Sequence, residues 1–186
     1  MSRLTNSSKK HSALEKIFND EGFVDYKWIT PEQIVVAQWV RMKCMFGCPN
    51  YGHKGACPPQ TPSVSECERF FNEYKNGVVF HFSLQNDKSE ERIKWYRETA
   101  TRLIELESKV FLAGFERAYM LLFGGCYLCV DCSGERSQCK LPEMARPAPE
   151  GLAVDVFSTV KNVGYPISVK TDPSQAADRY VMLMVD

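Results

Sequence analysis

Apolar residues recur along the chain at two spacings, which predict a mixture of helices and strands. The longest pattern is a stripe whose members stand three or four residues apart: Ile93, Tyr96, Ala100, Leu103, Leu106 and Val110. This spacing places the stripe on one face of a long helix over residues 88–113, which Gly114 can end. Shorter patterns of the same kind predict helices at residues 14–18, 63–74 and 153–163.

Other apolar runs are short and either alternate with polar residues or are uniformly apolar, as in strands. They predict strands at residues 24–28, 34–40, 78–82, 118–123, 167–169 and 180–185, although 34–40 is also compatible with a helix. Helices and strands alternate imperfectly, so we expect an α+β or α/β fold. In this fold helices flank a mixed sheet, and residues 1–186 form a single domain.

The charges of the chain balance, with 23 Lys and Arg residues against 23 Asp and Glu residues. This balance gives no overall field that would recruit nucleic acid or an anionic membrane. The longest apolar run, residues 118–123, is far shorter than the roughly 20 residues that a membrane helix needs. The first ten residues are largely polar and lack the apolar core of a secretory signal, so we expect a cytoplasmic protein.

Eight cysteines are the most unusual feature of the composition, and most of them fall in two clusters. In a cytoplasmic chain, clustered cysteines indicate metal binding or redox chemistry rather than a disulfide framework. Both clusters follow predicted strands and contain Gly and Pro, so we expect two cysteine-rich metal loops at strand ends. The exception is Cys67, which falls on the apolar stripe of helix 63–74 and is expected to be a core residue.

The second cluster has the spacing C-x2-C-x2-C-x6-C, formed by Cys126, Cys129, Cys132 and Cys139. Its first three positions match the run of bacterial ferredoxins, in which a tight loop presents thiolates to the irons of one cluster. Gly124 and Gly125 precede it and allow the backbone to approach a cluster closely. Zinc is the main rival, although zinc sites more often pair two C-x2-C hooks across a longer spacer.

The first cluster has the spacing C-x3-C-x8-C, formed by Cys44, Cys48 and Cys57. Three thiolates are one short of the four that hold a [4Fe–4S] cluster. The fourth ligand could be Cys139 reaching across, or His53 from within the loop. Alternatively, the fourth iron stays open to water or substrate, which would make the site catalytic.

Three functions fit these clusters. The leading one is electron transfer, or a redox-accessory role, by one or two [4Fe–4S] clusters that exchange electrons with a partner protein. The second is an enzyme in which an open three-cysteine cluster binds substrate near polar side chains: Arg41, Tyr51, His53 and Lys54. The third is a zinc-stabilised interaction module, in which the metal acts mainly on folding.

Sequence motifs around both clusters resemble the uncharacterised "predicted metal-binding protein" family of unknown function: Lys43-Cys44, Gly47-Cys48-Pro49-Asn50-Tyr51-Gly52, Cys57-Pro58-Pro59, Gly125-Cys126, Leu128-Cys129, Cys132 and Cys139. Trp39-Val40-Arg41, Arg146-Pro147 and Gly151 fit as well. The resemblance implies metal binding in an anaerobic cytoplasm and implies no particular reaction. It also implies that seven cysteines serve as ligands and that Cys67 does not: Cys44, Cys48, Cys57, Cys126, Cys129, Cys132 and Cys139.

Overall fold

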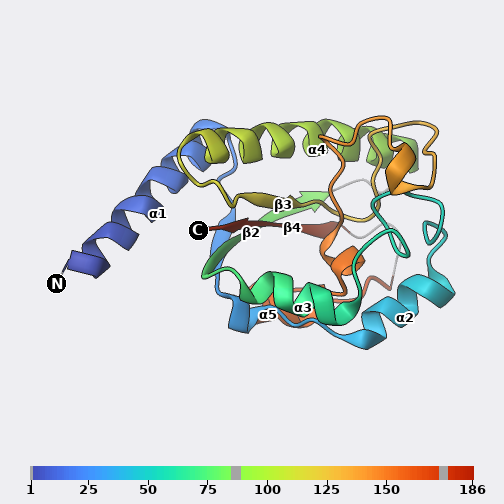
Figure 1. Ribbon diagram of the computed structural model, residues 1–186, viewed down its shortest axis with the longest axis horizontal. Coiled ribbons are helices and arrows are strands. Elements are labelled where there is room, and N and C mark those ends of the chain that lie inside the picture. Colours follow the sequence, from blue (N-terminus) through green and yellow to red (C-terminus); the bar gives the residue numbers. More distant parts are fainter. Residues whose placement is uncertain (1, 85–88, 172–175) are drawn as a thin grey trace.

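The computed structural model describes residues 2–84, 89–171 and 176–186 of the chain (Figure 1). Its helices are α1 (Ser2–Asp20), α2 (Gln38–Gly47), α3 (Val64–Asn72), α4 (Ser89–Leu112) and α5 (Val156–Asn162), and its strands are β1 (Tyr26–Ile29), β2 (Asn76–Leu84), β3 (Tyr119–Leu121) and β4 (Ala177–Val185). The predicted start of the long helix at Lys88 lies outside the described residues. None of the helices in the described part is long and apolar enough to cross a membrane.

The four strands form one open sheet in the order β1-β2-β4-β3, and every neighbouring pair is antiparallel. The predicted α+β class is confirmed, whereas the prediction of a mixed sheet is wrong. The β2-α4-β3 segment does behave as a crossover, because β2 and β3 both run antiparallel to β4 and therefore parallel to each other. The carboxyl-terminal strand β4 lies between them, and the order of elements along the sequence does not reveal that insertion.

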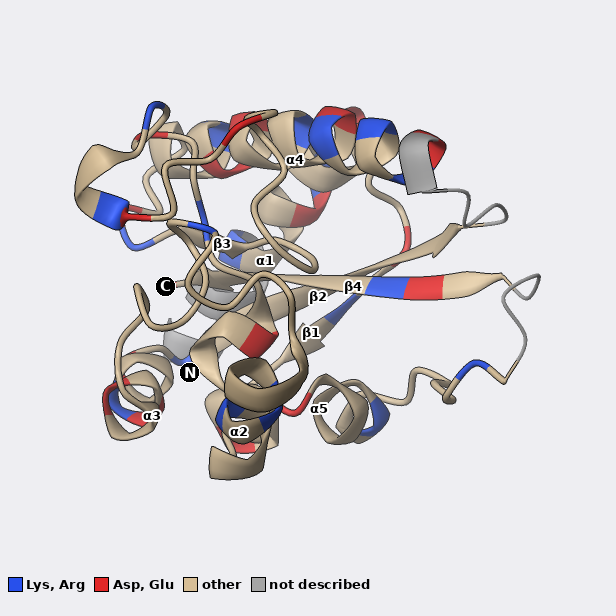
Figure 2. Ribbon diagram, turned by 90° about the vertical axis from the view of Figure 1, so that its right-hand side faces the viewer, with Lys and Arg blue, Asp and Glu red and all other residues tan. Residues whose placement is uncertain are grey.

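Helices cover both faces of the sheet, which therefore lies in the middle of three layers (Figures 1 and 2). On one face α1 and α4 pack against side chains such as Phe80 and Leu183. On the other face α3 and α5 pack against alternate strand residues such as Val79 and Met182. Because successive strand residues point to opposite faces, burial of both faces requires a continuous apolar strand. The fully buried run at residues 180–185 of β4 meets this requirement.

Two predicted strands are wrong. Residues 34–37 are extended but pair with residues 153–155 instead of joining the sheet: Ala37 N donates to Ala153 O at 2.8 Å, and Asp155 N donates to Val35 O at 2.7 Å. The chain then enters α2 at Gln38, so the helical alternative holds for the end of that run. Residues 167–169 form no strand, and Val169 is largely exposed to solvent. Both apolar runs are short, and the pattern of a short run does not distinguish a strand from other conformations.

Candidate metal centre

The two cysteine-containing segments meet at the end of the molecule that lies farthest from the amino terminus (Figure 1). We call residues 44–57 the first cysteine segment and residues 126–139 the second. Gly55 N donates a hydrogen bond to Cys132 Sγ at 3.4 Å, which joins the two segments directly. Beside this contact, Arg136 N donates to Gln60 Oε1 at 3.1 Å. The two cysteine segments therefore lie side by side at this end of the molecule.

Close approaches at glycines lock the two segments together. A β-carbon added to Gly125 would lie 2.8 Å from Asn50 Nδ2, and one added to Gly134 would lie 3.3 Å from Gly52 O. Gly134 has a φ of +81°, a conformation that residues with side chains rarely adopt. These positions therefore need glycine for space, and Gly134 needs it for backbone conformation as well.

The second segment gathers its four cysteines around one small cavity beside Gly55 and Ala56 of the first segment. We call Cys126, Cys129, Cys132 and Cys139 the four-cysteine group. Cys139 lies with the other three, so the structure does not place it across the junction as the fourth ligand of the first segment. All four thiols come from irregular backbone after β3, as the sequence predicts.

The first segment presents its cysteines differently, and we call Cys44, Cys48 and Cys57 the three-cysteine group. Cys44 lies within α2 and Cys48 directly follows it, so the prediction that this segment follows a strand is wrong. A spacing of four residues places these two side chains on the same side of the helix, and both line a cavity of about 590 Å³. Cys57 is buried and lies close to the second segment, because a β-carbon on Gly125 would lie 3.7 Å from Cys57 Sγ.

Burial and nearby charges shift the thiol pKa values in different directions. Burial raises the pKa of Cys57 to about 11 and also raises the pKa values of Cys44 and Cys126. At Cys132 partial burial acts in the same direction, but N–H bonds from Gly134 and Gly55 and the charges of two lysines outweigh it and lower the pKa. Metal binding deprotonates a cysteine, so the buried thiols require a positive centre to ionise, while Cys132 is already disposed to do so.

The remaining predicted site residues take structural or peripheral places. Cys67 is only 1% exposed and its Sγ donates to Pro62 O at 3.6 Å, which agrees with its prediction as a core residue. Arg41 spans from α2 to the neighbouring loops, where its Nη2 donates to Pro62 O and Gly151 O. His53 is exposed, and Lys54 Nζ lies 5.8 Å from the centre of the Tyr127 ring.

The donor sets of both groups fit a metal that prefers sulfur ligands. Thiolates are the ligands of zinc and of iron–sulfur clusters, and seven of them stand at this end of the molecule. Arg41 Nε adds a buried N–H without a hydrogen-bond partner among the described residues, and the charge of Arg41 favours ionisation of Cys44. As the side chains stand, no three His, Cys, Asp or Glu residues in the described parts of the chain are close enough to hold a single metal ion.

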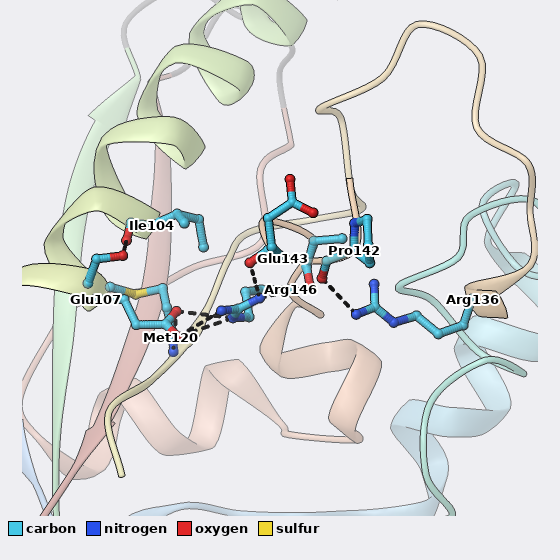
Figure 3. A network of polar contacts seen from close by, with 9 residues as sticks. Ile104, Glu107, Met120, Arg136, Pro142, Glu143 and Arg146 are labelled. Carbon is cyan, nitrogen blue, oxygen red and sulfur yellow. Dashed lines mark hydrogen bonds and ion pairs between the residues drawn. The ribbon is translucent and has the colours of Figure 1, made fainter. Parts of the chain in front are cut away.

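The sequence did not reveal a buried ion pair that holds the chain just after Cys139 (Figure 3). Arg146 donates to Glu107 of α4 at 2.9 Å, and the two side chains are only 18% and 10% exposed. Glu107 also accepts a hydrogen bond from Met120 N of β3 at 3.1 Å. The one available signal was that Glu107 stands next to Leu106 and four residues after Leu103, within the predicted apolar stripe.

Comparison with known proteins gives one match. A family described as "Predicted metal-binding protein (DUF2284)" matches residues 27–185, from β1 to the end of β4. The matched region contains both cysteine segments in full. No curated protein and no solved structure is similar enough to this chain to match it.

Proposed function

Because the chain belongs to the family of predicted metal-binding proteins, we propose that its metal is iron, held in at least one [4Fe–4S] cluster that transfers electrons. The observation that carries this proposal is the four-cysteine group, whose members share one small cavity and have the C-x2-C-x2-C spacing of ferredoxins. A second cluster would be held by the three-cysteine group. An iron–sulfur cluster supplies one-electron chemistry, and the protein sets its potential through burial, charge and hydrogen bonds.

The residues around the four-cysteine group suit that role. The bond from Gly55 N to Cys132 Sγ, and the positive charges of Lys54 and Lys140 near the same sulfur, would stabilise the negative charge of a thiolate-bound cluster. Glycines on both segments permit the close backbone approach that a cluster requires. The chain would thus hold the cluster through thiolates and tune it through neighbouring N–H groups and cations.

A redox partner protein and a cytoplasmic location are part of the proposal. Phe46 is 76% exposed and Val130 is 80% exposed, and each lies within two residues of a cysteine of the two groups. Exposed apolar side chains beside a redox centre would suit a transient partner. All eight cysteines are free thiols, which accords with a reducing compartment such as an anaerobic cytoplasm.

A second candidate function is an enzyme that binds substrate at an open iron of the three-cysteine group. The specific observation in its favour is the cavity of about 590 Å³ that Cys44 and Cys48 line. If this function is correct, a ligand that enters the cavity shifts the visible spectrum of the iron-loaded protein, and Cys48→Ala abolishes the shift. A pure electron carrier shows no such response.

The test of the proposed function is metal analysis of protein purified without oxygen and reconstituted with iron and sulfide. We expect brown protein with acid-labile sulfide and an electron paramagnetic resonance signal after reduction with dithionite. Cys139→Ala should lose the iron of the four-cysteine group, whereas the matched control Cys67→Ala should keep it. Colourless protein with stoichiometric zinc would contradict the proposal and support a zinc-stabilised interaction module instead.

A further inference from the structure

A well-formed cavity of the described structure lies where the edge of the sheet meets the three-cysteine group. Strand β3 pairs with β4 only at Met182, Leu183 and Met184, and the cavity lies beside the β4 residues that precede them. The other walls come from α2, the start of α5 and residues 167–170. Figure 2 looks towards this end of the molecule and shows β4 between α4 and α5. The cavity, at about 590 Å³, is within the usual size range of small-molecule sites.

Apolar and aromatic side chains dominate the walls of this cavity. Tyr96 and Phe123 contribute from the core, while Trp39, Phe157 and Val169 line it and remain 47%, 39% and 74% exposed. Large apolar side chains that stay exposed inside a concave site gain by contact with an apolar ligand. The walls therefore favour a ligand with an apolar body over a fully polar one such as a sugar.

Carboxylates and cations line the cavity in equal number, so its selectivity depends on which of them are already engaged: Glu150, Asp155, Asp178, Lys43, Lys170 and Arg179. Asp155 is engaged as the N-cap of α5, where it accepts hydrogen bonds from Ser158 N and Ser158 Oγ. Asp178 Oδ1 lies 2.8 Å from His81 Nε2. Two of the three carboxylates are thus engaged within the protein, and so is Arg179, whose Nε donates to Tyr96 Oη at 2.6 Å.

Of the three cations that line the cavity, Lys43 is the nearest in sequence to a cysteine, because it stands one residue before Cys44. Its ammonium lies 5.1 Å from the centre of the Trp39 ring, and within the described residues no carboxylate pairs with it. The ammonium is therefore available to an anionic group that enters the cavity beside the thiols. This places a positive charge at the cysteine end of the cavity, next to walls in which apolar and aromatic side chains dominate.

We infer that the cavity binds a small organic carboxylate with an apolar body, and that Lys43 recognises its carboxylate at the cysteine end. The inference rests on the proposed function in one respect, namely that a metal is bound at the cysteine end of the cavity. It deepens the second candidate function by giving the chemical class of the ligand. A carboxylate is also the kind of oxygen ligand that an open metal position accepts.

The experiment is isothermal titration calorimetry on the iron-loaded protein, with benzoate as the probe and its neutral analogue benzamide as the comparison. We expect benzoate to bind about tenfold more tightly than benzamide, because both rings fill the same walls and only one carries the charge. Lys43→Met should weaken benzoate binding about fivefold and leave benzamide unchanged. The matched control is Lys161→Met, since Lys161 lies on α5 but does not line the cavity.

The outcomes separate this inference from the proposed function. Equal affinity for benzoate and benzamide, or no binding of either to protein that contains iron and sulfide, would contradict the inference. Neither result would contradict the proposed iron–sulfur cluster. Tighter binding of benzoate than of benzamide to protein that contains only zinc would support the inference and contradict the proposed iron–sulfur cluster. Selectivity that survives Lys43→Met would show that another residue recognises the carboxylate and would contradict the role given to Lys43.

Discussion

The four-cysteine group and the three-cysteine group lie side by side, yet the protein builds them in opposite ways. The four-cysteine group comes from one continuous stretch of irregular backbone and closes around a small cavity. The three-cysteine group takes Cys44 from α2, Cys48 from the residue that follows it and Cys57 from the next loop, and the first two line a cavity of about 590 Å³. A closed donor set suits a metal that exchanges electrons only, whereas an open one suits a metal that also meets a ligand.

The supports of the two groups differ as well. Behind the four-cysteine group, Arg146 and Glu107 form a buried ion pair that ties the chain after Cys139 to α4 (Figure 3). Beside the cavity of the three-cysteine group, His81 lies between the carboxylates of Asp25 and Asp178, which are about half exposed. The comparison suggests a rigid centre on one side and a more accessible, pH-sensitive surrounding on the other.

The largest expected effect is loss of the metal of one group while the other keeps its own. Cys129→Ala should remove the iron of the four-cysteine group, and Cys48→Ala should instead remove the spectral response of the three-cysteine group to added ligand. The measurements are iron and sulfide content and visible spectra. Cys67→Ala is the control. Because Cys67 is buried, this substitution should lower the free energy of unfolding by about 1–2 kcal/mol, but the protein should keep all its iron. Simultaneous loss of both centres in every variant would mean that the two groups form one site.

Removal of the buried ion pair should have the largest effect on stability. Arg146→Met leaves the Glu107 carboxylate buried without its partner and should lower the free energy of unfolding by about 3 kcal/mol. The measurement is urea unfolding at constant pH. Lys94→Met breaks the exposed pair between Lys94 and Glu98 and should change the same quantity by less than about 0.5 kcal/mol. Equal effects would show that burial does not strengthen the pair between Arg146 and Glu107.

The junction between the two segments should be sensitive to a single methyl group. Gly134→Ala combines a positive φ with a contact of 3.3 Å to Gly52 O, so we expect a loss of about 2 kcal/mol in unfolding free energy. Gly47→Ala is the matched control, because nothing lies within 4 Å of the added carbon and Gly47 ends α2. That substitution should be neutral or slightly stabilising. Tolerance of alanine at residue 134 would show that the segments are not locked there.

The cluster of His81 should make stability depend on pH. Burial lowers the pKa of His81, but its contacts with Asp25 and Asp178 outweigh burial and raise it, while the pKa of Asp25 is lowered by His81 and by the hydroxyl of Tyr165 despite its own burial. The stabilisation is therefore complete between about pH 4 and pH 6.5. It declines above that window as His81 loses its proton and below it as Asp25 gains one.

Replacement of His81 tests this window. His81→Asn should lower the free energy of unfolding by about 1.5 kcal/mol at pH 5.5, a value reduced for the exposure of the two carboxylates. At pH 9 the difference from wild type should be much smaller. Urea unfolding at both pH values is the measurement. A difference that is the same at pH 5.5 and pH 9 would show that the contact with Asp25 and Asp178 does not depend on the charge of His81.

The smallest expected effect concerns the helix that follows the first cysteine segment. Ser63 caps α3, with its backbone N–H donating to Glu66 Oε2 at 2.8 Å and its side chain accepting from Glu66 N. Ser63→Ala should lower the unfolding free energy by about 1 kcal/mol without loss of iron. Ser65→Ala removes only a long contact of 3.4 Å between Ser65 Oγ and Ser63 Oγ, so it should change the same quantity by less than half as much. Loss of iron in Ser63→Ala would mean that α3 helps to position the three-cysteine group.

The spacing of apolar residues predicted an element correctly wherever the pattern was long enough to distinguish a helix from a strand. The stripe of the long helix located α4 and its end at Gly114, and the apolar run at residues 180–185 located β4. It failed at residues 34–40 and 167–169, where short apolar runs are buried or exposed by contacts that the sequence does not encode locally. The sequence could not predict the relative directions of neighbouring strands, because β4, which comes from far along the chain, inserts between β2 and β3.

The sequence by itself determined that the cysteines form two groups by spacing, and the apolar stripe of residues 63–74 determined that Cys67 belongs to the core. This information is local, because thiol spacing and helical periodicity depend only on residues that are close together in the sequence. Only the tertiary structure decided that Cys139 lies with the four-cysteine group, that Cys44 and Cys48 open onto a large cavity, and that Arg146 reaches Glu107. Those facts depend on contacts between residues far apart in the chain, which the folding of the whole domain fixes.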